Sequence, residues 1–328
     1  MNKVLSLCLL FIVLFTGCSS KQYFEPEDSN NFPKNSKDLE FSIIDLNVDG
    51  ATLENYSYIS KKGVIKTSTK IGYSFINQID ETILTADNNA SINIYSTKMD
   101  KHLSFEKNII SASINKNLLA FGSEDNSITL YDLDTNQILF KEYLEHSHVN
   151  NIKIANPIFL NSVVLYPTLD GKIIIVDIKN KSIIKTINLD PQSDVNNIIF
   201  LQELDDALIA ATSKKLFTFI NGQPSIKSLE IQSIIIKGKF IYIATLDGNI
   251  IKYDKSLNLI ASKKFKFAKI NALAFGTSLY ALESQGYLVK ITPDFQNVIV
   301  YDFSFDEEEK VIAIDNKIYF EDEYIELD

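Results

Sequence analysis

The sequence predicts an all-β chain folded as a single β-propeller of about seven four-stranded blades, with eight as the alternative. Three observations predict it. After residue 40 the chain consists of short apolar runs broken by Gly, Asn and Asp, and no stretch keeps a helical period. One hairpin unit recurs at a spacing of about 39 residues, which is the length of a propeller blade. The run Ile173–Val176 is apolar at every position, which indicates a strand buried on both faces.

The first 17 residues predict a signal peptide. Lys3 precedes an apolar stretch, Val4–Phe15, that is shorter than the about 20 residues a membrane-spanning helix needs. Gly17 and Cys18 follow, and small residues before a cysteine at this point resemble the bacterial lipobox. The resemblance implies cleavage before Cys18 and lipid attachment to its sulfur, and the alternative is an ordinary signal peptide with a chance cysteine.

Cysteine usage agrees with that interpretation. The chain has two cysteines, Cys8 in the signal peptide and Cys18 at the cleavage point. After processing no free thiol would be left for a disulfide, a cysteine metal site or a cysteine nucleophile. Ser19 resembles the residue that follows the cysteine in lipoproteins sent to the outer membrane. We therefore expect a lipid-anchored protein of the cell envelope, at the outer membrane and facing the periplasm.

Residues 18–40 are predicted to form a flexible tether. They are polar, include Pro26 and Pro33, and show no apolar period. A free chain of this length has an r.m.s. span of roughly 25 Å. The propeller is expected to begin at residue 41 and to occupy residues 41–328.

The recurring unit is an apolar strand, a turn of Ser, Thr, Asp and Gly, and a second apolar strand. Clear copies are Leu118–Asp132, Val163–Asp177 and Ile241–Asp254; weaker ones are Ile83–Tyr95, Leu208–Phe219 and Leu279–Ile291. The first apolar residue after each turn recurs at intervals of 34 to 45 residues, at Ile92, Ile128, Ile173, Leu216, Ile250 and Leu288. A seventh copy, Lys317–Ile325, is incomplete.

The runs between these hairpins supply the other two strands of each blade. Outer strands are predicted at Gln137–Phe140 and Ser182–Ile187, and inner strands at Asn151–Ile154, Asn197–Phe200 and Ile270–Phe275. The last unit is incomplete, and residues 41–70 hold unassigned strand-like runs. We therefore expect N-terminal strands to complete the last blade and close the ring, which hides edges that would otherwise aggregate.

Two propeller families resemble these repeats. Phe121–Leu133 resembles a WD40 repeat, with Tyr131-Asp132 where that family has Trp-Asp, and Pro167–Asp177 and Ala244–Ile250 resemble the repeat of quinoprotein (PQQ-type) propellers. Joined to the lipobox, the pattern is similar to the BamB family, the lipoprotein scaffolds of the outer-membrane β-barrel assembly machine. That resemblance implies a non-enzymatic propeller that binds the periplasmic part of the barrel-inserting subunit. The chain departs from the family in its short length and in having no Arg.

Residue usage gives little support to catalysis. The quinone cofactor of these propellers is typically stacked on Trp beside a vicinal disulfide, and this chain has no Trp. His146 and His148 could offer a metal two imidazoles, but the structural histidine that WD40 repeats carry between blades is the favoured interpretation. Recurring carboxylates at Asp132, Asp177 and Asp254, and at the Asp-Gly tips Asp170 and Asp247, are expected to fix turns.

Charge sets the remaining expectations. A net charge of −10 and a pI of about 5.0 argue against nucleic acid as a partner. The acidic run Asp306–Glu309 is expected to be a solvated loop, with contact to a Lys-rich partner as the alternative.

The sequence thus predicts no enzyme and no catalytic, cofactor-binding or metal-binding residue, with lipidation at Cys18 as the one site. The predicted function is an interaction scaffold for envelope proteins, in the manner of BamB. The alternatives are a propeller subunit of another envelope, secretion or motility complex, and a ligand-binding or enzymatic propeller.

Overall fold

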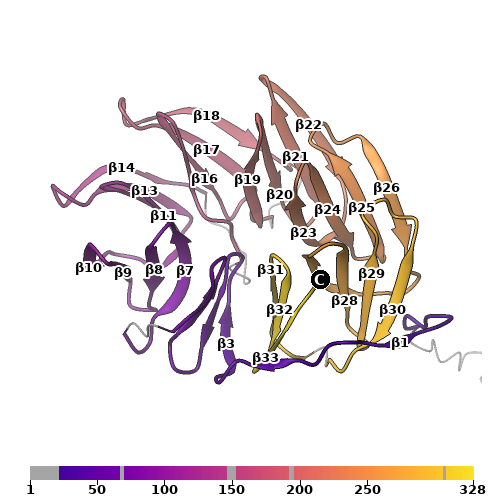
Figure 1. Cartoon of the computed structure of the whole chain (residues 1–328). Coiled ribbons are helices and arrows are strands. Elements are labelled where there is room, and N and C mark those ends of the chain that lie inside the picture. The colour runs from indigo at the N-terminus through magenta and orange to yellow at the C-terminus, as the bar shows by residue number, and fades with distance from the viewer. Residues whose placement is uncertain (1–21, 67–69, 146–152, 192–195, 306–307) are drawn as a thin grey trace, which may run out of the picture.

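The computed structural model describes residues 22–66, 70–145, 153–191, 196–305 and 308–328, and every regular element in these ranges is a β-strand. The strands form eight sheets arranged around a central axis as the blades of a β-propeller (Figure 1). The all-β propeller is therefore confirmed, with the eight blades that the sequence left as the alternative to seven. Within these ranges, no helix is long and apolar enough to cross a membrane.

The first four blades follow one another along the chain. Blade one is β3 (Ile43–Leu46), β4 (Ala51–Leu53), β5 (Tyr58–Ser60) and β6 (Gly63–Ile65). Blade two is β7 (Ser74–Ile79), β8 (Thr82–Ala86), β9 (Ser91–Ser96) and β10 (Met99–Ser104). Blade three is β11 (Ile109–Asn115), β12 (Leu118–Ser123), β13 (Ser127–Asp132) and β14 (Gln137–Tyr143). Blade four is β15 (Ile158–Leu160), β16 (Val163–Pro167), β17 (Lys172–Asp177) and β18 (Ser182–Asn188).

The last four blades include both ends of the described chain. Blade five is β19 (Phe200–Leu204), β20 (Ala207–Ala211), β21 (Lys215–Ile220) and β22 (Gln223–Ser228). Blade six is β23 (Ile231–Lys237), β24 (Phe240–Thr245), β25 (Asn249–Asp254) and β26 (Leu259–Lys264). Blade seven is β27 (Ile270–Phe275), β28 (Leu279–Glu283), β29 (Tyr287–Ile291) and β30 (Val298–Asp302), extended by β1 (Asn30–Asn31). Blade eight is β31 (Val311–Ile314), β32 (Lys317–Phe320), β33 (Glu323–Glu326) and β2 (Lys37–Asp38).

The predicted hairpins are the second and third strands of blades two to seven, and the incomplete copy is β32 and β33. Each of the six residues aligned after the turn is at most 1% exposed, so the register that the repeats predicted is confirmed. Blade one does not show the sequence repeat, because its strands have only three or four residues each and its turn carries no Asp-Gly tip.

Two inner strands were predicted too early in the chain. In blade four the inner strand is Ile158–Leu160; of the predicted Asn151–Ile154, residues 151–152 lie outside the described residues and residues 153–154 are not in a strand. In blade five the inner strand is Phe200–Leu204 rather than Asn197–Phe200. Ile154 and Ile198 are buried all the same, outside the strand ladders, and Ile198 packs at the boundary of these two blades. Because buried residues are apolar whether or not they pair in a strand, the sequence around these two residues resembles a strand.

The core is divided among the blade boundaries. Among the described residues the buried apolar side chains form eight clusters, one between each pair of neighbouring blades. Between blades three and four, for example, Leu130 packs with Val164 and Tyr166. Each blade therefore buries its two faces only against its neighbours, which explains the runs that are apolar at every position.

The turns between strands lie at two opposite ends of each blade. Because the four strands alternate in direction, the turn between the second and third strands lies at the same end as the connection from the fourth strand to the next blade. We call this end of the propeller the turn face. In blades one to six the strand nearest the axis comes first along the chain and the strand at the rim comes last; in blades seven and eight the outermost strands, β1 and β2, come from the N-terminal segment.

An N-terminal strand closes the ring, as predicted. β2 pairs antiparallel with β33, placing Lys37 opposite Tyr324 and Asp38 opposite Glu323. Backbone hydrogen bonds continue the junction from Leu39 N to Asp322 O, 2.7 Å, and from Ile43 N to Glu321 O, 2.8 Å. Leu39 is buried in the cluster between blades eight and one. The ring is thus sealed by hydrogen bonds and by apolar packing together.

The closing strand lies inside the segment that was expected to be a tether. The indigo N-terminal segment crosses the outside of blades seven and eight before it enters blade one (Figure 1). Its strand β1 adds to blade seven parallel to β30, and the buried Phe24 and Leu39 fix it to the ring. Residues 24–40 therefore differ from the expected free chain, because isolated apolar residues in a polar segment were enough to dock it.

Truncation of Leu39 should weaken ring closure. We expect Leu39→Ala to lower the free energy of unfolding by about 3 kcal/mol, since the residue is buried and its loss leaves a cavity between blades eight and one. Urea denaturation followed by circular dichroism measures this. Ile71→Ala, at an 84% exposed position, is the matched control and should change stability by less than about 0.5 kcal/mol. Equal effects of the two substitutions would contradict the closure described here.

Candidate protein-docking site

The turn face carries two copies of one motif. Thr-Leu-Asp-Gly occurs at 168–171 in blade four and at 245–248 in blade six. In both copies the Thr hydroxyl donates to the Asp carboxylate at 2.5 Å, and it accepts from the backbone N–H of the residue after Gly. Gly248 has φ +78°, and a Cβ there would strike the backbone oxygen of Phe265. The tips are therefore rigid and closely packed against the next connection.

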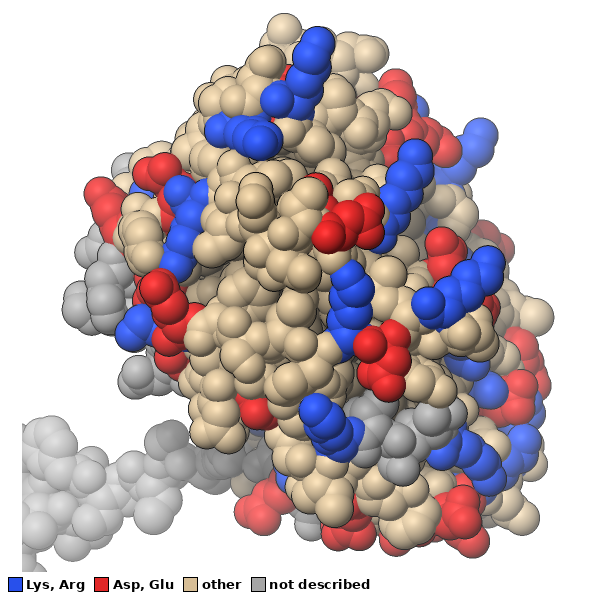
Figure 2. Space-filling model, turned by 90° about the vertical axis from the view of Figure 1, so that its left-hand side faces the viewer, with Lys and Arg blue, Asp and Glu red and all other residues tan. Residues whose placement is uncertain are grey.

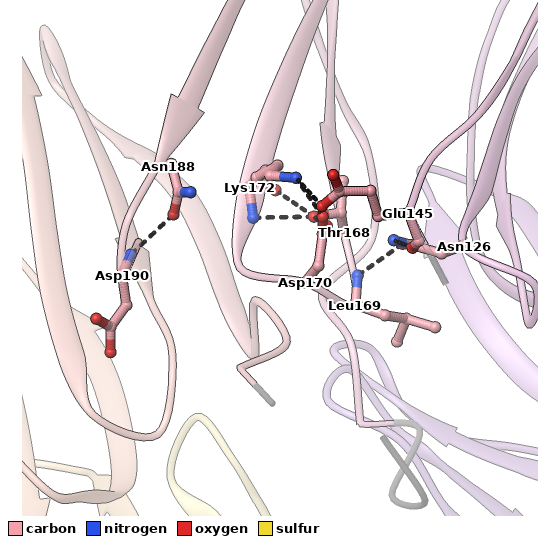
Figure 3. A network of polar contacts seen from close by, with 8 residues as sticks. All are labelled: Asn126, Glu145, Thr168, Leu169, Asp170, Lys172, Asn188 and Asp190. Carbon is pink, nitrogen blue, oxygen red and sulfur yellow. Dashed lines mark hydrogen bonds and ion pairs between the residues drawn. The ribbon is translucent and has the colours of Figure 1, made fainter. Parts of the chain in front are cut away.

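A polar network joins the tips of blades three and four (Figure 3). The Asn126 side chain donates to the Glu145 carbonyl, 2.8 Å, and accepts from Leu169 N, 2.9 Å. The Lys172 ammonium lies 2.6 Å from Asp170 and 3.2 Å from Glu145. This ties neighbouring blades together at the turn face.

The Asp carboxylates of the two tips titrate below their usual range. At Asp170 burial alone would raise the pKa, but hydrogen bonds from Lys172 and Thr168 outweigh it and the pKa is lowered. At Asp247 the hydrogen bond from Lys264 and then that from Thr245 lower the pKa to about 2. Both groups are therefore ionised partners within fixed turns.

The other recurring carboxylates cap the turns between third and fourth strands. Asp132 accepts from Asp134 N at 2.8 Å and Thr135 N at 3.2 Å. Asp254 accepts from Ser256 N and Asn258 N, both at 2.9 Å. Asp177 accepts from Asn180 N at 2.5 Å. The prediction that these residues fix turns is confirmed.

The central channel is a cavity of about 1240 Å³ between the inner strands. Asn156, which precedes the inner strand of blade four, crosses this space to the first three blades. Its amide nitrogen donates to Asp49 at 2.7 Å and to the Ile76 carbonyl at 3.2 Å, and its oxygen accepts from Ala112 N at 2.9 Å. One buried side chain thus joins four blades.

The inner strands near Asn156 share a recurring irregularity. The inner strands of blades one, two, three, six and seven each have a register shift near their start. Such a bulge leaves backbone groups outside the ladder. Near three of these shifts, side chains of neighbouring elements accept from inner-strand backbone N–H groups: Thr52 from Phe75 N, Asn156 from Ala112 N, and Ser233 from Leu273 N.

A second hollow, of about 640 Å³, lies at the rim between blades two and three. We call it the rim groove. Its floor is aromatic: the Phe105 ring centroid lies 4.5 Å from Phe121 and 5.3 Å from Tyr131. The Thr129 hydroxyl also lines the groove, and it is buried without a hydrogen-bond partner. Rings beside an unused hydroxyl suit an apolar side chain that carries one polar group.

A charged pair stands at the edge of the rim groove. Lys141 lies 2.8 Å from Glu106, and its ammonium is 4.7 Å from the centre of the Tyr143 ring. The hydrogen bond from Lys141 lowers the pKa of the exposed Glu106 carboxyl. Tyr143 itself is 62% exposed. Its large exposed ring is of the residue type enriched at binding hot spots.

The rim continues as a belt of exposed apolar residues. Every outer strand from β14 to β30 exposes at least one; the belt consists of Ile138, Tyr143, Ile183, Ile184, Ile226, Leu259, Ile260 and Ile299. Figure 2 views the molecule from the side of β10 and β14, where uncharged residues form a continuous area and charges of both signs are scattered. We call these eight residues the rim belt.

Outer strands are also exposed edges, and Lys141, Lys185 and Lys227 on them agree with protection against unspecific strand pairing. The edges nevertheless accept a strand, because β1 pairs with β30. The rim therefore combines apolar side chains with unpaired backbone groups, which is the combination a protein partner can use.

Several residues singled out in the sequence lie outside the described residues: Cys18, His146, His148, Asp306 and Glu307. Glu308 and Glu309 follow an undescribed stretch, and Glu308 is exposed. In the part of the chain that the structure describes, no group of three His, Cys, Asp or Glu residues is placed to hold a metal. Sequence reasoning missed Asn156 and the rim groove, since both depend on contacts between blades.

Comparison with known proteins gives one sequence relative in two strains. The plasminogen-binding protein PgbB of Helicobacter pylori strain J99 is 28% identical over 393 aligned positions, covering 99% of this chain and 71% of the relative. The same protein of strain 26695 is 27% identical, with the same coverage. No family model matches the chain.

Solved structures show the same fold. BamB from Moraxella catarrhalis superposes with a TM-score of 0.65 at 13% identity, over 88% of this chain and 95% of that one. The C-terminal WD40 domain of Sif2 gives 0.64 at 14% identity, over 91% and 100%. BamB and a WD40 propeller, both of which the sequence resembles, are therefore among the structural neighbours.

Acid should weaken the turn face of blade six through Asp247. Because the folded pKa of about 2 lies below the ordinary 3.8, ionised Asp247 stabilises the fold above pH 3.8, and this contribution is lost as pH falls toward 2. We expect Asp247→Asn and Lys264→Met each to flatten the stability profile in that window. Urea unfolding at stepped pH measures it, and an unchanged slope in both variants would contradict the assignment.

Loss of Asn156 should uncouple the inner strands. We expect Asn156→Ala to lower the free energy of unfolding by about 1–3 kcal/mol, because buried polar groups of Ala112 and Ile76 lose a partner. Asn180→Ala, at an exposed position of a rim turn, is the control and should be near neutral. Comparable stability of the two variants in urea would show that the channel contact is not structural.

Proposed function

We propose that this chain is a non-catalytic, protein-binding propeller of the cell envelope, held at a membrane by lipid on Cys18. The rim belt carries the proposal. Contiguous exposed apolar surface is rare on proteins that act alone and marks interaction sites. Eight large apolar residues are exposed on the outer strands of five consecutive blades, and an aromatic groove lies beside the first of them.

The proposal of a non-catalytic role is supported by how the carboxylates are used. The residues that recur from blade to blade accept backbone N–H groups or pair with lysine inside rigid turns. A carboxylate committed in this way is held ionised and cannot readily exchange a proton near neutral pH.

The first candidate partner is an envelope protein, and in the finer form of the proposal it belongs to outer-membrane protein assembly. The lipobox and the propeller together support it, since the neighbour BamB has the same fold. The partner would place apolar side chains on the rim belt and one of them in the rim groove. A subunit of another envelope, secretion or motility complex would dock in the same manner.

Plasminogen is the second candidate, and a specific observation favours it. The sequence relative that aligns with 99% of this chain is a plasminogen-binding protein. Every one of the 32 basic residues here is Lys, so a partner that recognises cationic side chains would meet only lysine. Competition by free lysine would then release plasminogen, whereas it should leave contacts with the rim belt intact.

The experiment is affinity capture from envelope extracts with the full-length, tagged chain, followed by mass spectrometry. In parallel, binding of immobilised plasminogen is measured with and without free lysine. For a rim partner we expect Tyr143→Ala and Ile184→Ser to weaken binding at least tenfold, because each removes exposed apolar area at the contact.

Ile71→Ser is the matched control, since it removes an exposed apolar residue that is not part of the rim belt. Equal binding by all three variants would exclude the rim belt as the contact. A captured protein of the barrel assembly machine supports the finer proposal, and unchanged outer-membrane barrel levels after gene deletion would count against it.

A further inference from the structure

The N-terminal segment is fixed to the ring from Phe24 onward, whereas a free tether would first contact the ring near residue 41. Phe24 is buried between blades six and seven, with its ring centroid 6.0 Å from Phe265 and 5.6 Å from Tyr287, both edge-on. Phe265 follows the last strand of blade six, and Tyr287 begins the third strand of blade seven. Phe24 therefore docks at the turn face.

The chain between this contact and Cys18 is short. Cys18 lies six residues before Phe24, and six residues span at most about 22 Å even when fully extended. A lipid on Cys18 can therefore lie no farther than that from the turn face of blades six and seven. Blade three, on the opposite side of the ring of eight, is not held in this way (Figure 1).

An apolar patch is exposed at the same place. Leu246, in the tip of blade six, and Phe267, in the connection to blade seven, are 50% and 42% exposed. A hydrogen bond from Phe265 N to Gly248 O, 2.8 Å, holds the two segments together, and one from Ala268 N to Phe265 O, 3.1 Å, closes the turn that contains Phe267. Phe267 is two residues from the ring against which Phe24 packs.

The backbone at Phe267 is strained. Its φ of +66° lies in the left-handed region, which a bulky residue rarely adopts. A strained turn that exposes a large aromatic ring to solvent is unfavourable unless a functional contact of the ring compensates for it. Removal of the ring from water by a neighbouring surface would supply one.

The charges around the patch suit a bilayer interface. The loop carries Lys263, Lys264, Lys266 and Lys269. Lys264 pairs with Asp247 at 2.7 Å, and the Lys266 ammonium lies 4.7 Å from the centre of the Phe267 ring. Glu25, Glu27 and Glu230 are exposed nearby in the docked segment and the neighbouring connection, so the attraction is not purely electrostatic. Long lysine stems beside aromatic rings are typical of the headgroup region.

We propose that the turn face of blades six and seven lies against the membrane, with Phe267 and Leu246 inserted among the lipid headgroups. The inference rests on the lipid anchor at Cys18 in the proposed function. Two weak apolar insertions beside an acyl anchor fix orientation, as a second membrane signal does for a lipidated chain. The rim groove between blades two and three then lies on the opposite side of the ring from this membrane contact.

The chain has no Trp, so a single introduced Trp reports its own surroundings. Three variants of the full-length, processed protein are purified from membranes and reconstituted in vesicles of phosphatidylethanolamine and phosphatidylglycerol: Phe267→Trp, Leu246→Trp as a second reporter, and Tyr143→Trp as the exposed control at the rim groove. Emission is recorded with and without lipids that carry a bromine quencher on the acyl chain.

We expect the emission of Phe267→Trp and Leu246→Trp to shift to the blue on reconstitution and to be quenched at least twofold by brominated lipid, while Tyr143→Trp stays water-like. Water-like emission at both 267 and 246 in protein that floats with the vesicles would overturn the inference. A blue shift without bromine quenching would also overturn it, because another protein surface would then cover the patch.

Acyl labelling distinguishes failure of the proposed insertion of Phe267 and Leu246 from failure of the proposed lipid anchor at Cys18. If labelled palmitate enters the wild-type chain and is lost in Cys18→Ser, the anchor stands whatever the fluorescence shows. If the wild-type chain takes up no label, the anchor in the proposed function falls and the inference that rests on it falls too.

Discussion

The whole fold depends on the fact that no blade can bury its own faces. The apolar side chains are shared between neighbours, one cluster at each blade boundary, and a blade with a free face would expose Leu, Ile and Tyr residues over its full height. The ring must therefore close. Closure falls to a short strand, Lys37–Asp38, supported by Leu39 and Ile43, and so a few residues at the N-terminus control the stability of a propeller of eight blades.

The same N-terminal segment determines which side of the ring lies nearest to Cys18. Before it reaches the closing strand it docks Phe24 between blades six and seven and adds β1 to the outside of blade seven. Closure and the proposed anchoring at Cys18 would thus be carried by one continuous stretch. A pull on Cys18 would be borne first by the Phe24 contact and by β1, before it reached the closing strand. In the proposed arrangement the rim of blade three lies on the opposite side of the ring from the anchor.

Sequence patterns predicted the hairpins because every copy has paired apolar runs, and the three clear copies add an Asp-Gly or Ser-Glu-Asp tip and a capping Asp. They failed where structure is set by distant contacts. Blade one has strands of three or four residues, too short for a pattern, and Ile154 and Ile198 are buried outside any strand. Asn156 has an ordinary sequence context, and only the closed ring brings it to Asp49, Ile76 and Ala112. The same holds for the rim belt: its residues are apolar like those of the core, and the sequence pattern does not show that they are exposed.

Amide hydrogen exchange of the intact chain tests closure by the N-terminal segment most directly. The amides of Leu39 and Ile43, which donate to Asp322 and Glu321, should exchange as slowly as those of β32 and β33, because the segment and the last blade open as one cooperative unit. Exchange of Leu39 and Ile43 at the rate of an unstructured peptide, with β32 and β33 still protected, would show that the last blade is stable without the segment and would contradict the account.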